Sequence, residues 1–279
     1  MTYAPITIQA RRVLLDALAA LEDHRAALVL VGAQAIYLYT GEADVAIATQ
    51  TKDGDLAVVP DHLAATPLLE VAMARAGFRH DPHVDQPGVW LSPDGYPVEL
   101  LVPAELHAGG GRRGARIPPH SNRAARVVPG LEAAAVDHQP REIRALDPAD
   151  ARVIAMQVAS PAALVVAKLY KIGERHDQSP GRLLDKDAHD LFRLLRAVET
   201  EPVAVSLARL QRDPIAGRVT VQALTWLRMF CATPDGLVPV MAGRTEALIG
   251  SPAEVAAAMW ALAQDLLERL TKLESERTR

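Results

Sequence analysis

The sequence predicts an α+β fold in which a mixed sheet with flanking helices is followed by a helical C-terminal domain. Residues 1–158 alternate helical spacing of apolar side chains with short apolar runs, whereas residues 159–279 keep helical spacing almost to the end. In addition, Ser92-Pro-Asp-Gly95 separates two apolar runs, which is typical of a β-hairpin. We therefore expect two domains, 1–158 and 159–279.

The elements of the first domain follow from apolar spacing and from the residues that end each run. Gly32 ends one apolar run, Pro60 ends another, and Asp61 is a suitable N-cap for a helix. We expect helices over residues 7–26, 33–41 and 61–76, and strands over residues 27–31, 56–59, 88–92 and 96–102, with further short strands between 124 and 158.

The second domain is expected to be helical throughout. Ser160-Pro161 is a start signal for its first helix, because Ser is a favoured N-cap and Pro is tolerated in the first turn. The intervening Pro-Gly, Asp-Pro and Pro-Asp-Gly sequences are expected to be loops. The predicted helices cover residues 161–175, 184–197, 203–211, 219–231 and 252–275.

Charge and composition limit the classes of function. The 279 residues include 30 Lys and Arg against 34 Asp and Glu, a net charge of −4, which excludes a uniformly basic coat for nucleic acid. Aromatic residues make up 4% of the chain, so we expect no aromatic platform for base stacking. Any contact with nucleic acid must therefore involve phosphates.

Cysteine content and hydropathy indicate the compartment. Cys231 is the single cysteine, which excludes an intramolecular disulfide and fits a reducing cytoplasm. No run approaches the roughly 18 uncharged apolar residues of a membrane helix. We expect a cytoplasmic protein with no membrane or DNA partner.

Three carboxylates give the strongest chemical signal. Asp53 and Asp55 are two residues apart at the start of a predicted strand, so their side chains are expected on one side of it. Glu99 interrupts another apolar strand, where a lone charge is unfavourable unless it is paired or binds a cation. Carboxylate clusters suit Mg²⁺, which also takes water and substrate phosphates as ligands.

These acids belong to an order of motifs that resembles the nucleotidyltransferase fold. The matching segments are Val31-Gly32-Ala33-Gln34-Ala35, Thr51-Lys52-Asp53-Gly54-Asp55-Leu56 and Pro97-Val98-Glu99-Leu100-Leu101. Further along, the helical segments 168–175 and 185–191, which carry Lys168 and Asp190, are similar to the signature of the AbiEii/MenT-type nucleotidyltransferase toxins. The resemblance covers residues 10–200.

The resemblance implies a role for each matching residue. Asp53, Asp55 and Glu99 would hold Mg²⁺, or Mn²⁺ in its place, and Lys168 and Asp190 would complete the catalytic set. Nucleotide binding is implied for Gly32, Ala33, Thr51, Lys171, Arg175 and Asp187. The implied reaction transfers a nucleoside monophosphate from an NTP to the 3′ end of tRNA. The implied biological role is that of a toxin with a cognate antitoxin protein as partner.

Two residues depart from the family pattern. Ala33 stands where the family usually has Ser or Gly, so a hydroxyl that would contact phosphate is missing, although backbone N–H groups at a helix start could serve. Gly54 stands between the aspartates in place of a larger apolar residue.

Basic residues supply candidate phosphate contacts. Lys168, Lys171 and Arg175 share one helix face, where they could meet a triphosphate or could be a solvated face paired with Asp187 and Asp190. The segment 106–131 is Gly-rich and has five arginines, of which Arg112, Arg113 and Arg116 are candidates for RNA binding. The same segment could instead be a solvated loop.

Two other functions remain open from the sequence. The chain could modify a small hydroxylated molecule such as an aminoglycoside. It could also be a catalytically silent nucleotidyltransferase-like binding module, which Ala33 permits.

Overall fold

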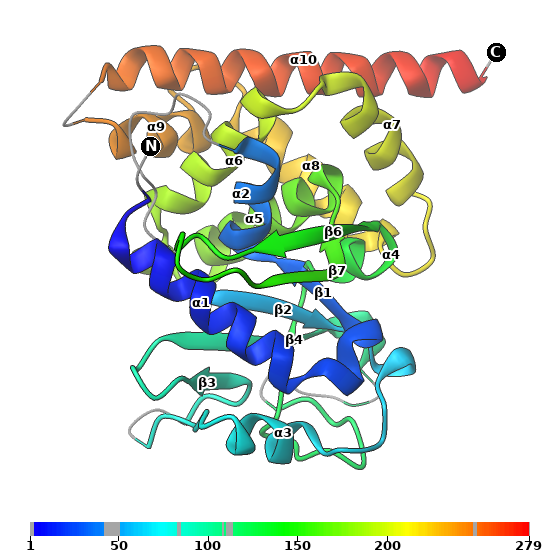
Figure 1. The fold of residues 1–279 in the computed structure, drawn as a ribbon. Helices are drawn as coiled ribbons and strands as arrows, with labels where there is room; N and C mark the ends of the chain where they lie inside the picture. The colour runs from blue at the N-terminus through cyan, green and yellow to red at the C-terminus, as the bar shows by residue number, and fades with distance from the viewer. Residues whose placement is uncertain are drawn as a thin grey trace. The chain divides into compact units, whose positions relative to one another are not determined.

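The computed structural model describes residues 3–41, 51–82, 85–107, 109, 114–247 and 250–278 (Figure 1). The chain divides into two compact units, Met1–Leu38 with Gln50–Ala159 and Tyr39–Thr49 with Ser160–Arg279. The first unit contains a mixed sheet with flanking helices and the second is helical, which confirms the predicted fold class.

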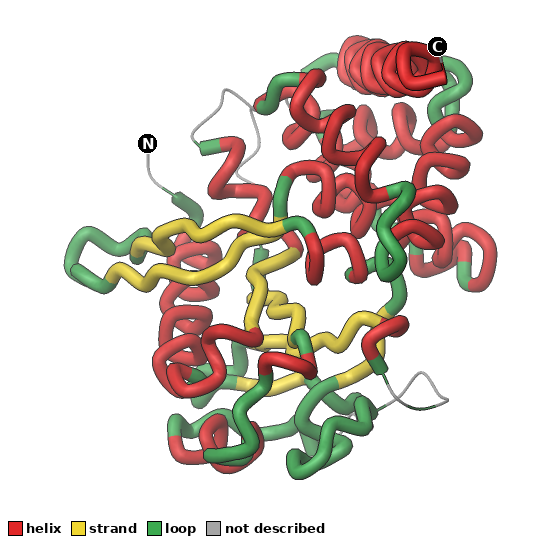
Figure 2. The backbone as a smooth tube through the Cα atoms, turned by 90° about the vertical axis from the view of Figure 1, so that its right-hand side faces the viewer, coloured by secondary structure: helices red, strands yellow, loops and turns green. Residues whose placement is uncertain are grey.

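The sheet of the first unit has seven strands within the described residues, in the order β3-β4-β2-β1-β7-β6 with β5 beside β4. β1 is antiparallel to β2 and parallel to β7, while β2 and β4 are parallel. Figure 2 shows the β6–β7 ribbon extending past the other strands. The strands are β1 Leu28–Val31, β2 Gly54–Val58, β3 Val89–Leu91, β4 Pro97–Pro103, β5 Arg126–Val128, β6 His138–Arg144 and β7 Val153–Ala159.

Helix α1, Pro5–Ala20, packs on β2 and β4 (Figure 1). Its Leu14 is fully buried over the start of β2, where a Cβ on Gly54 would lie 3.1 Å from Leu14 Cδ1. That separation is tighter than most van der Waals contacts, so the residue between the two aspartates is small because α1 lies close to the strand there.

The predicted strands and the Pro-Asp-Gly hairpin are confirmed, but three helical segments of the first unit differ from the prediction. One helix was predicted over residues 7–26. In the structure α1 ends at Ala20, and a separate 3₁₀ helix, Glu22–Ala27, follows it. The predicted helix 61–76 is shorter, a 3₁₀ turn Pro60–His62 followed by α3, Leu69–Arg75, because Pro67 cannot donate a hydrogen bond inside a longer helix. The short helix α4, Glu132–Val136, was not predicted.

Two short elements remain: α2, Gly32–Thr40, which follows β1 as predicted and whose residues up to Leu38 belong to the first unit, and the 3₁₀ turn Ala104–Leu106.

The second unit consists of helices packed on one another. Ser160 begins α5 as predicted, because its side chain accepts a hydrogen bond of 3.1 Å from the Ala163 N–H. Gly173 lets α5 approach α8, where an added Cβ would lie 2.1 Å from Trp226 Cδ2. The helix α9 lies in a segment for which no element was predicted. The elements are α5 Pro161–Gln178, the 3₁₀ turn Pro180–Arg182, α6 Asp185–Ala197, α7 Thr200–Leu210, α8 Gly217–Phe230, α9 Leu237–Thr245 and α10 Pro252–Thr278.

Over the part of the chain that the structure describes, no helix is both long enough and apolar enough to cross a bilayer. Cys231 is buried against the end of α8, and burial raises the pKa of its thiol to about 12, as expected for a packing residue.

A pair of buried histidines lies in the first unit. The rings of His24 and His120 contact each other edge to face, with centroids 5.5 Å apart. His120 Nδ1 accepts a hydrogen bond of 3.1 Å from the Leu69 N–H, and its Nε2 lies 3.0 Å from the Ala64 carbonyl oxygen. These contacts fit a neutral ring with the proton on Nε2. Burial lowers the pKa of His120, and the neighbouring His24 lowers it further.

The lowered pKa predicts acid sensitivity. The unfolded chain binds a proton at His120 below about pH 6.5, whereas the folded chain resists it, so the free energy of unfolding should fall as the pH drops through this value. We expect a smaller fall between pH 7.5 and 5.5 in His120→Asn, which has an acceptor but does not titrate. Urea unfolding at both pH values measures this, and equal pH slopes for the two proteins would contradict it.

Candidate active site

Strand register places two of the predicted acids side by side. Asp55 on β2 is the register partner of Glu99 on the parallel strand β4, and on its other side it faces Val31, the last residue of β1. The end of β1 and the starts of β2 and β4 therefore meet at one end of the sheet. Both acids are partly exposed, whereas their neighbours Gly54 and Val98 are buried.

The turn after β1 fits closely around Asp55. Gly32 has a φ of +68°, in the left-handed region that favours glycine, and a Cβ there would lie 2.0 Å from Asp55 Oδ2. The carboxylate thus lies against the first residue of α2. Glycine is needed at position 32 for its backbone conformation and for the space that the carboxylate takes.

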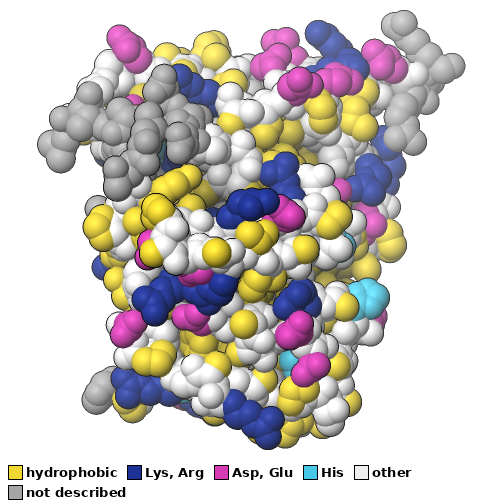
Figure 3. All heavy atoms as spheres, viewed as in Figure 1, with side chains coloured by type: hydrophobic (Ala, Val, Ile, Leu, Met, Phe, Trp, Pro, Cys, Tyr) yellow, Lys and Arg dark blue, Asp and Glu magenta, His cyan; other side chains and the backbone are white. Residues whose placement is uncertain are grey.

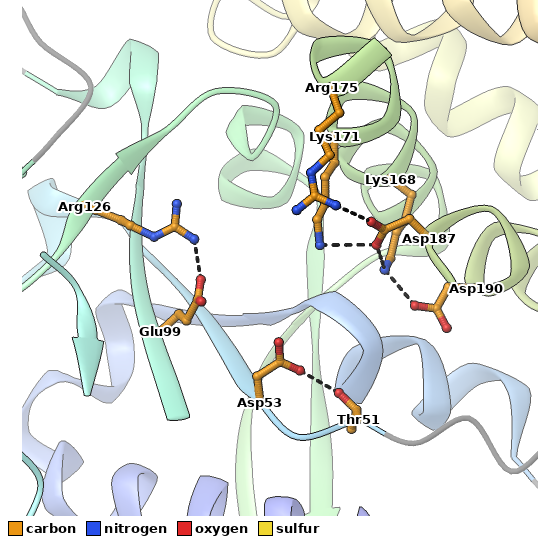
Figure 4. Close-up of polar contacts among 9 residues, drawn as sticks. All are labelled: Thr51, Asp53, Glu99, Arg126, Lys168, Lys171, Arg175, Asp187 and Asp190. Atoms are coloured by element: carbon orange, nitrogen blue, oxygen red, sulfur yellow. Dashed lines mark hydrogen bonds and ion pairs between the residues drawn. The ribbon is translucent and has the colours of Figure 1, made fainter. Parts of the chain in front are cut away.

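Asp53 directly precedes β2 and is oriented by its neighbour. The buried Thr51 hydroxyl donates a hydrogen bond of 2.7 Å to Asp53 Oδ1 (Figure 4). The Thr51 hydroxyl is thus engaged with a predicted metal ligand.

The start of α2 is fixed by a buried network that the sequence did not reveal. Arg11 Nε donates to Gln34 Oε1 at 2.9 Å, and Arg11 Nη1 donates to the Arg144 carbonyl oxygen at 2.9 Å. Burial lowers the pKa of Arg11 to about 10. Ala33 is also buried.

Glu99 has a cation partner within the first unit. Arg126 on β5 donates from Nη2 to Glu99 Oε2 (Figure 4). This contact satisfies the expectation that a charge on an apolar strand needs a partner. The sequence placed Arg126 in the basic segment but gave no sign of its acidic partner, which lies 27 positions earlier in the chain.

The donors fit a magnesium ion only in part. Mg²⁺ takes one or two protein carboxylates together with water and phosphate oxygens, and Asp53 and Asp55 supply suitable hard oxygen atoms. In the ranges that the structure describes, however, no three Asp, Glu, His or Cys side chains form a group that could hold a metal ion. Glu99 is paired with Arg126, and its role as a third metal ligand stays a prediction.

The second unit contains a compact ion cluster between α5 and α6 (Figure 4). Lys168 Nζ donates to Asp187 Oδ1 at 2.9 Å and to Asp190 Oδ2 at 2.7 Å. Lys171 Nζ lies 3.2 Å from Asp187 Oδ1, and Arg175 Nη1 donates to Asp187 Oδ2 at 3.0 Å. The cations predicted to share a helix face thus converge on one carboxylate.

Burial makes this cluster different from a solvated surface pair. Burial acts against the charge on Lys168, but Asp187 and Asp190 outweigh it and raise the pKa of Lys168. Burial likewise acts against the charge on Asp187, but Lys168, Lys171 and Arg175 hold its pKa below the usual range. Lys168 and Asp187 therefore remain charged across the physiological pH range. Asp190 Oδ1 is buried and, within the described residues, has no hydrogen-bond partner.

The candidate RNA-binding arginines are only partly described. Arg112 and Arg113 lie outside the described residues, and Arg116 is exposed. Arg123 and Arg126, in the same basic segment, are ion-paired to Asp85 and Glu99. Figure 3 shows Lys and Arg side chains interspersed with Asp and Glu over one face. The local positive charge is thus lower than the sequence of the segment indicates.

Comparison with known proteins identifies the class. A family model described as nucleotidyltransferase matches residues 10–213, so the chain belongs to this nucleotidyltransferase family, a class of transferases. No curated protein matches the chain. The match includes every predicted catalytic residue, and the finer resemblance to AbiEii/MenT-type toxins stays a prediction.

Two solved structures resemble the chain at low similarity. The antibiotic-resistance factor ANT(2″)-Ia is 15% identical over 74% of this chain and 92% of its own, with a TM-score of 0.41. A candidate nucleotidyltransferase from H. pylori is 11% identical over 97% of this chain and 98% of its own, with a TM-score of 0.38. Because these TM-scores are low, the family assignment rests on the family model.

The fit between Gly32 and Asp55 can be tested by adding one methyl group. We expect Gly32→Ala to be destabilised by about 1–2 kcal/mol through its positive φ and by a further 1–3 kcal/mol or so through overpacking against Asp55. Gly95→Ala is the matched control, because Gly95 has a φ of +81° but nothing within 4 Å of an added Cβ. Urea unfolding measures both variants, and equal losses would contradict the proposed contact.

The buried ion cluster predicts unequal roles for two lysines. Lys168→Met leaves buried carboxylates without their closest cation and should lower the free energy of unfolding by about 3–5 kcal/mol. Lys171→Met is the control, because 46% of the Lys171 side chain is exposed, and it should lose about 1 kcal/mol or less. Similar losses in the two variants would show that the cluster does not stabilise the second unit.

Proposed function

We propose that this protein transfers a nucleoside monophosphate from an NTP to the 3′ hydroxyl of tRNA, with Mg²⁺ as cofactor. Family membership supports the reaction class. The observation that carries the proposal is the position of Asp55, which lies against Gly32 at the start of α2 and beside Glu99 on β4.

That position combines the two parts that nucleotidyl transfer needs. Carboxylates are ligands for a divalent cation, and the amide groups at the start of a helix favour phosphate oxygens. The first turn of α2 and Asp55 are adjacent, so the cation and the triphosphate it binds can lie together. Phosphoryl transfer depends mainly on such positioning and charge neutralisation.

Each residue of the first unit then has a defined task. Asp53, oriented by Thr51, and Asp55 would hold Mg²⁺, which when bound neutralises charge on the triphosphate. The turn at Gly32 would position the phosphates through its backbone. Glu99 is placed to accept the proton of the acceptor hydroxyl while its oxygen attacks the α-phosphorus and pyrophosphate leaves.

The second unit is proposed to contribute Lys168 and Asp190 to catalysis, with Lys171, Arg175 and Asp187 contacting nucleotide. This assignment rests on the sequence similarity of its two helical segments to AbiEii/MenT-type toxins. The same similarity supports tRNA as the acceptor, growth inhibition as the outcome and a cognate antitoxin protein as partner. The exposed Arg116 is proposed to contact the RNA backbone.

A labelling experiment tests the reaction and its site together. The protein is incubated with each α-³²P-labelled NTP, Mg²⁺ and total tRNA, and label in tRNA is measured. We expect wild type to label tRNA, and we expect Asp53→Asn and Asp55→Asn to lower the rate by about 100-fold or more because each removes a ligand of the cation. Asp61→Asn, which changes an exposed carboxylate on the Pro60–His62 turn, should stay within about twofold of wild type.

Further arms identify the acceptor and the biological role. Periodate-oxidised tRNA has no 3′ hydroxyl and should remain unlabelled. Label in an aminoglycoside but not in tRNA would contradict the proposed acceptor, and equal labelling of tRNA by wild type and Asp55→Asn would contradict the proposed site. Induced expression of wild type, but not of Asp55→Asn, should arrest growth if the protein is a toxin.

A further inference from the structure

The ion pair between Arg126 and Glu99 lies inside the first unit, next to the proposed cation site. Arg126 is the register partner of Leu101 on β4, and its side chain reaches back to Glu99, the register partner of Asp55. The side chains are 27% and 20% exposed, so the pair is only partly shielded from water. A carboxylate next to a proposed metal ligand is thus already bound to a cation of the protein itself.

The backbone around Arg126 is held by several independent contacts. Gly88 has a φ of +78°, and a Cβ on it would lie 2.6 Å from Arg126 N and 2.6 Å from the Leu100 carbonyl oxygen. Trp90 Nε1 donates to the Ala124 carbonyl oxygen at 2.9 Å, and Ala115 N donates to the Ala125 carbonyl oxygen at 2.8 Å. These contacts fix the chain on which Arg126 is presented to Glu99.

The ion pair between Arg126 and Glu99 does not use all the hydrogen-bond donors of the guanidinium. The guanidinium reaches Glu99 through Nη2, while Arg126 Nε is buried and has no hydrogen-bond partner among the described residues. A bidentate guanidinium–carboxylate pair is stronger than one made through a single nitrogen. The backbone thus presents Arg126 firmly, but the contact leaves room for Glu99 to change partner.

We propose that Arg126 is a positioning residue that keeps Glu99 away from the first divalent cation, so that this cation is held by Asp53 and Asp55 without Glu99. The inference rests on the proposed function, because it presumes a cation at the two aspartates. A guanidinium and a divalent cation compete for the same carboxylate oxygens. While Arg126 is paired with Glu99, the Glu99 carboxylate is held in place to accept a proton and is not a metal ligand.

Binding of Mn²⁺ alone tests this proposal without any measurement of activity. Free Mn²⁺ is followed by electron paramagnetic resonance during titration of wild type, Arg126→Gln, Arg126→Lys and the double variant Arg126→Gln/Glu99→Gln. Arg126→Gln releases Glu99 and should bind Mn²⁺ about tenfold more tightly than wild type or take up a second ion. Arg126→Lys keeps the charge and should stay closer to wild type.

The double variant gives the sharpest comparison. It has the same net charge as wild type, because it removes one positive and one negative side chain. If Glu99 is not a ligand in wild type, the two proteins should bind Mn²⁺ with affinities within about twofold. Binding by the double variant that is tenfold weaker or more would show that Glu99 already binds the cation and would overturn the proposal.

Two controls separate the causes of a negative result. Arg123→Gln removes a nearby arginine that is paired to Asp85 and not to Glu99. If this variant gains as much Mn²⁺ affinity as Arg126→Gln, the gain comes from the loss of any positive charge, and the proposal is overturned. Asp55→Asn must weaken Mn²⁺ binding. If Asp55→Asn binds Mn²⁺ as tightly as wild type, the metal site of the proposed function is contradicted as well. If only Arg126→Gln has an unchanged Mn²⁺ affinity, this inference is overturned and the proposed function is not. Thermal unfolding confirms that each variant is folded.

Discussion

The register of β2 between β1 and β4 is the constraint on which the candidate site depends. It places Asp55 opposite Val31 on one side and Glu99 on the other, so that the turn after β1 meets both acids. A shift by one residue would turn the acids to the side that α1 covers, where Leu14 lies over Gly54. Burying the carboxylates there would be strongly unfavourable without cation partners. Packing of α1 and chemistry of the acids therefore select the same register.

Local sequence signals predicted most of the elements, because each depends on residues close in the chain. The run before Gly32, the Pro-Asp-Gly turn and the Ser160 cap all lie within a few positions of the structure they specify. Asp53 and Asp55 are both partly exposed, although Asp53 directly precedes β2 and is not part of it. Two cases show the limit: the helix expected over residues 61–76 is shorter in the structure, and no element was predicted for α9. Marginal helical segments such as these are decided by tertiary packing.

The contacts within the candidate site were less predictable, because they join residues far apart in the chain. The basic segment 106–131 contains no acid, yet Asp85 and Glu99, from earlier parts of the chain, neutralise two of its arginines. The positive charge counted along a sequence segment is thus larger than the net positive charge that a phosphate near the folded segment would contact. Arg11 is a similar case: its position on the first helix gave no sign that it would be buried against Gln34 and the Arg144 carbonyl oxygen.

In the ion cluster of the second unit, burial makes Lys168, Lys171 and Arg175 differ in their access to solvent, although their spacing in the sequence places them on one helix face. The cluster contains three cations and two carboxylates, so it has one positive charge in excess. The exposed fraction of each cationic side chain decides which cation an anion from solvent can contact. Lys168 is 7% exposed and bound to both carboxylates, whereas Lys171 is 46% exposed and, among the described residues, is paired with Asp187. An anion must displace a buried carboxylate to reach Lys168, but it can reach Lys171 directly. Any role of Lys168 with phosphate therefore requires rearrangement of Asp187 or Asp190, while Lys171 can act from the cluster as it stands.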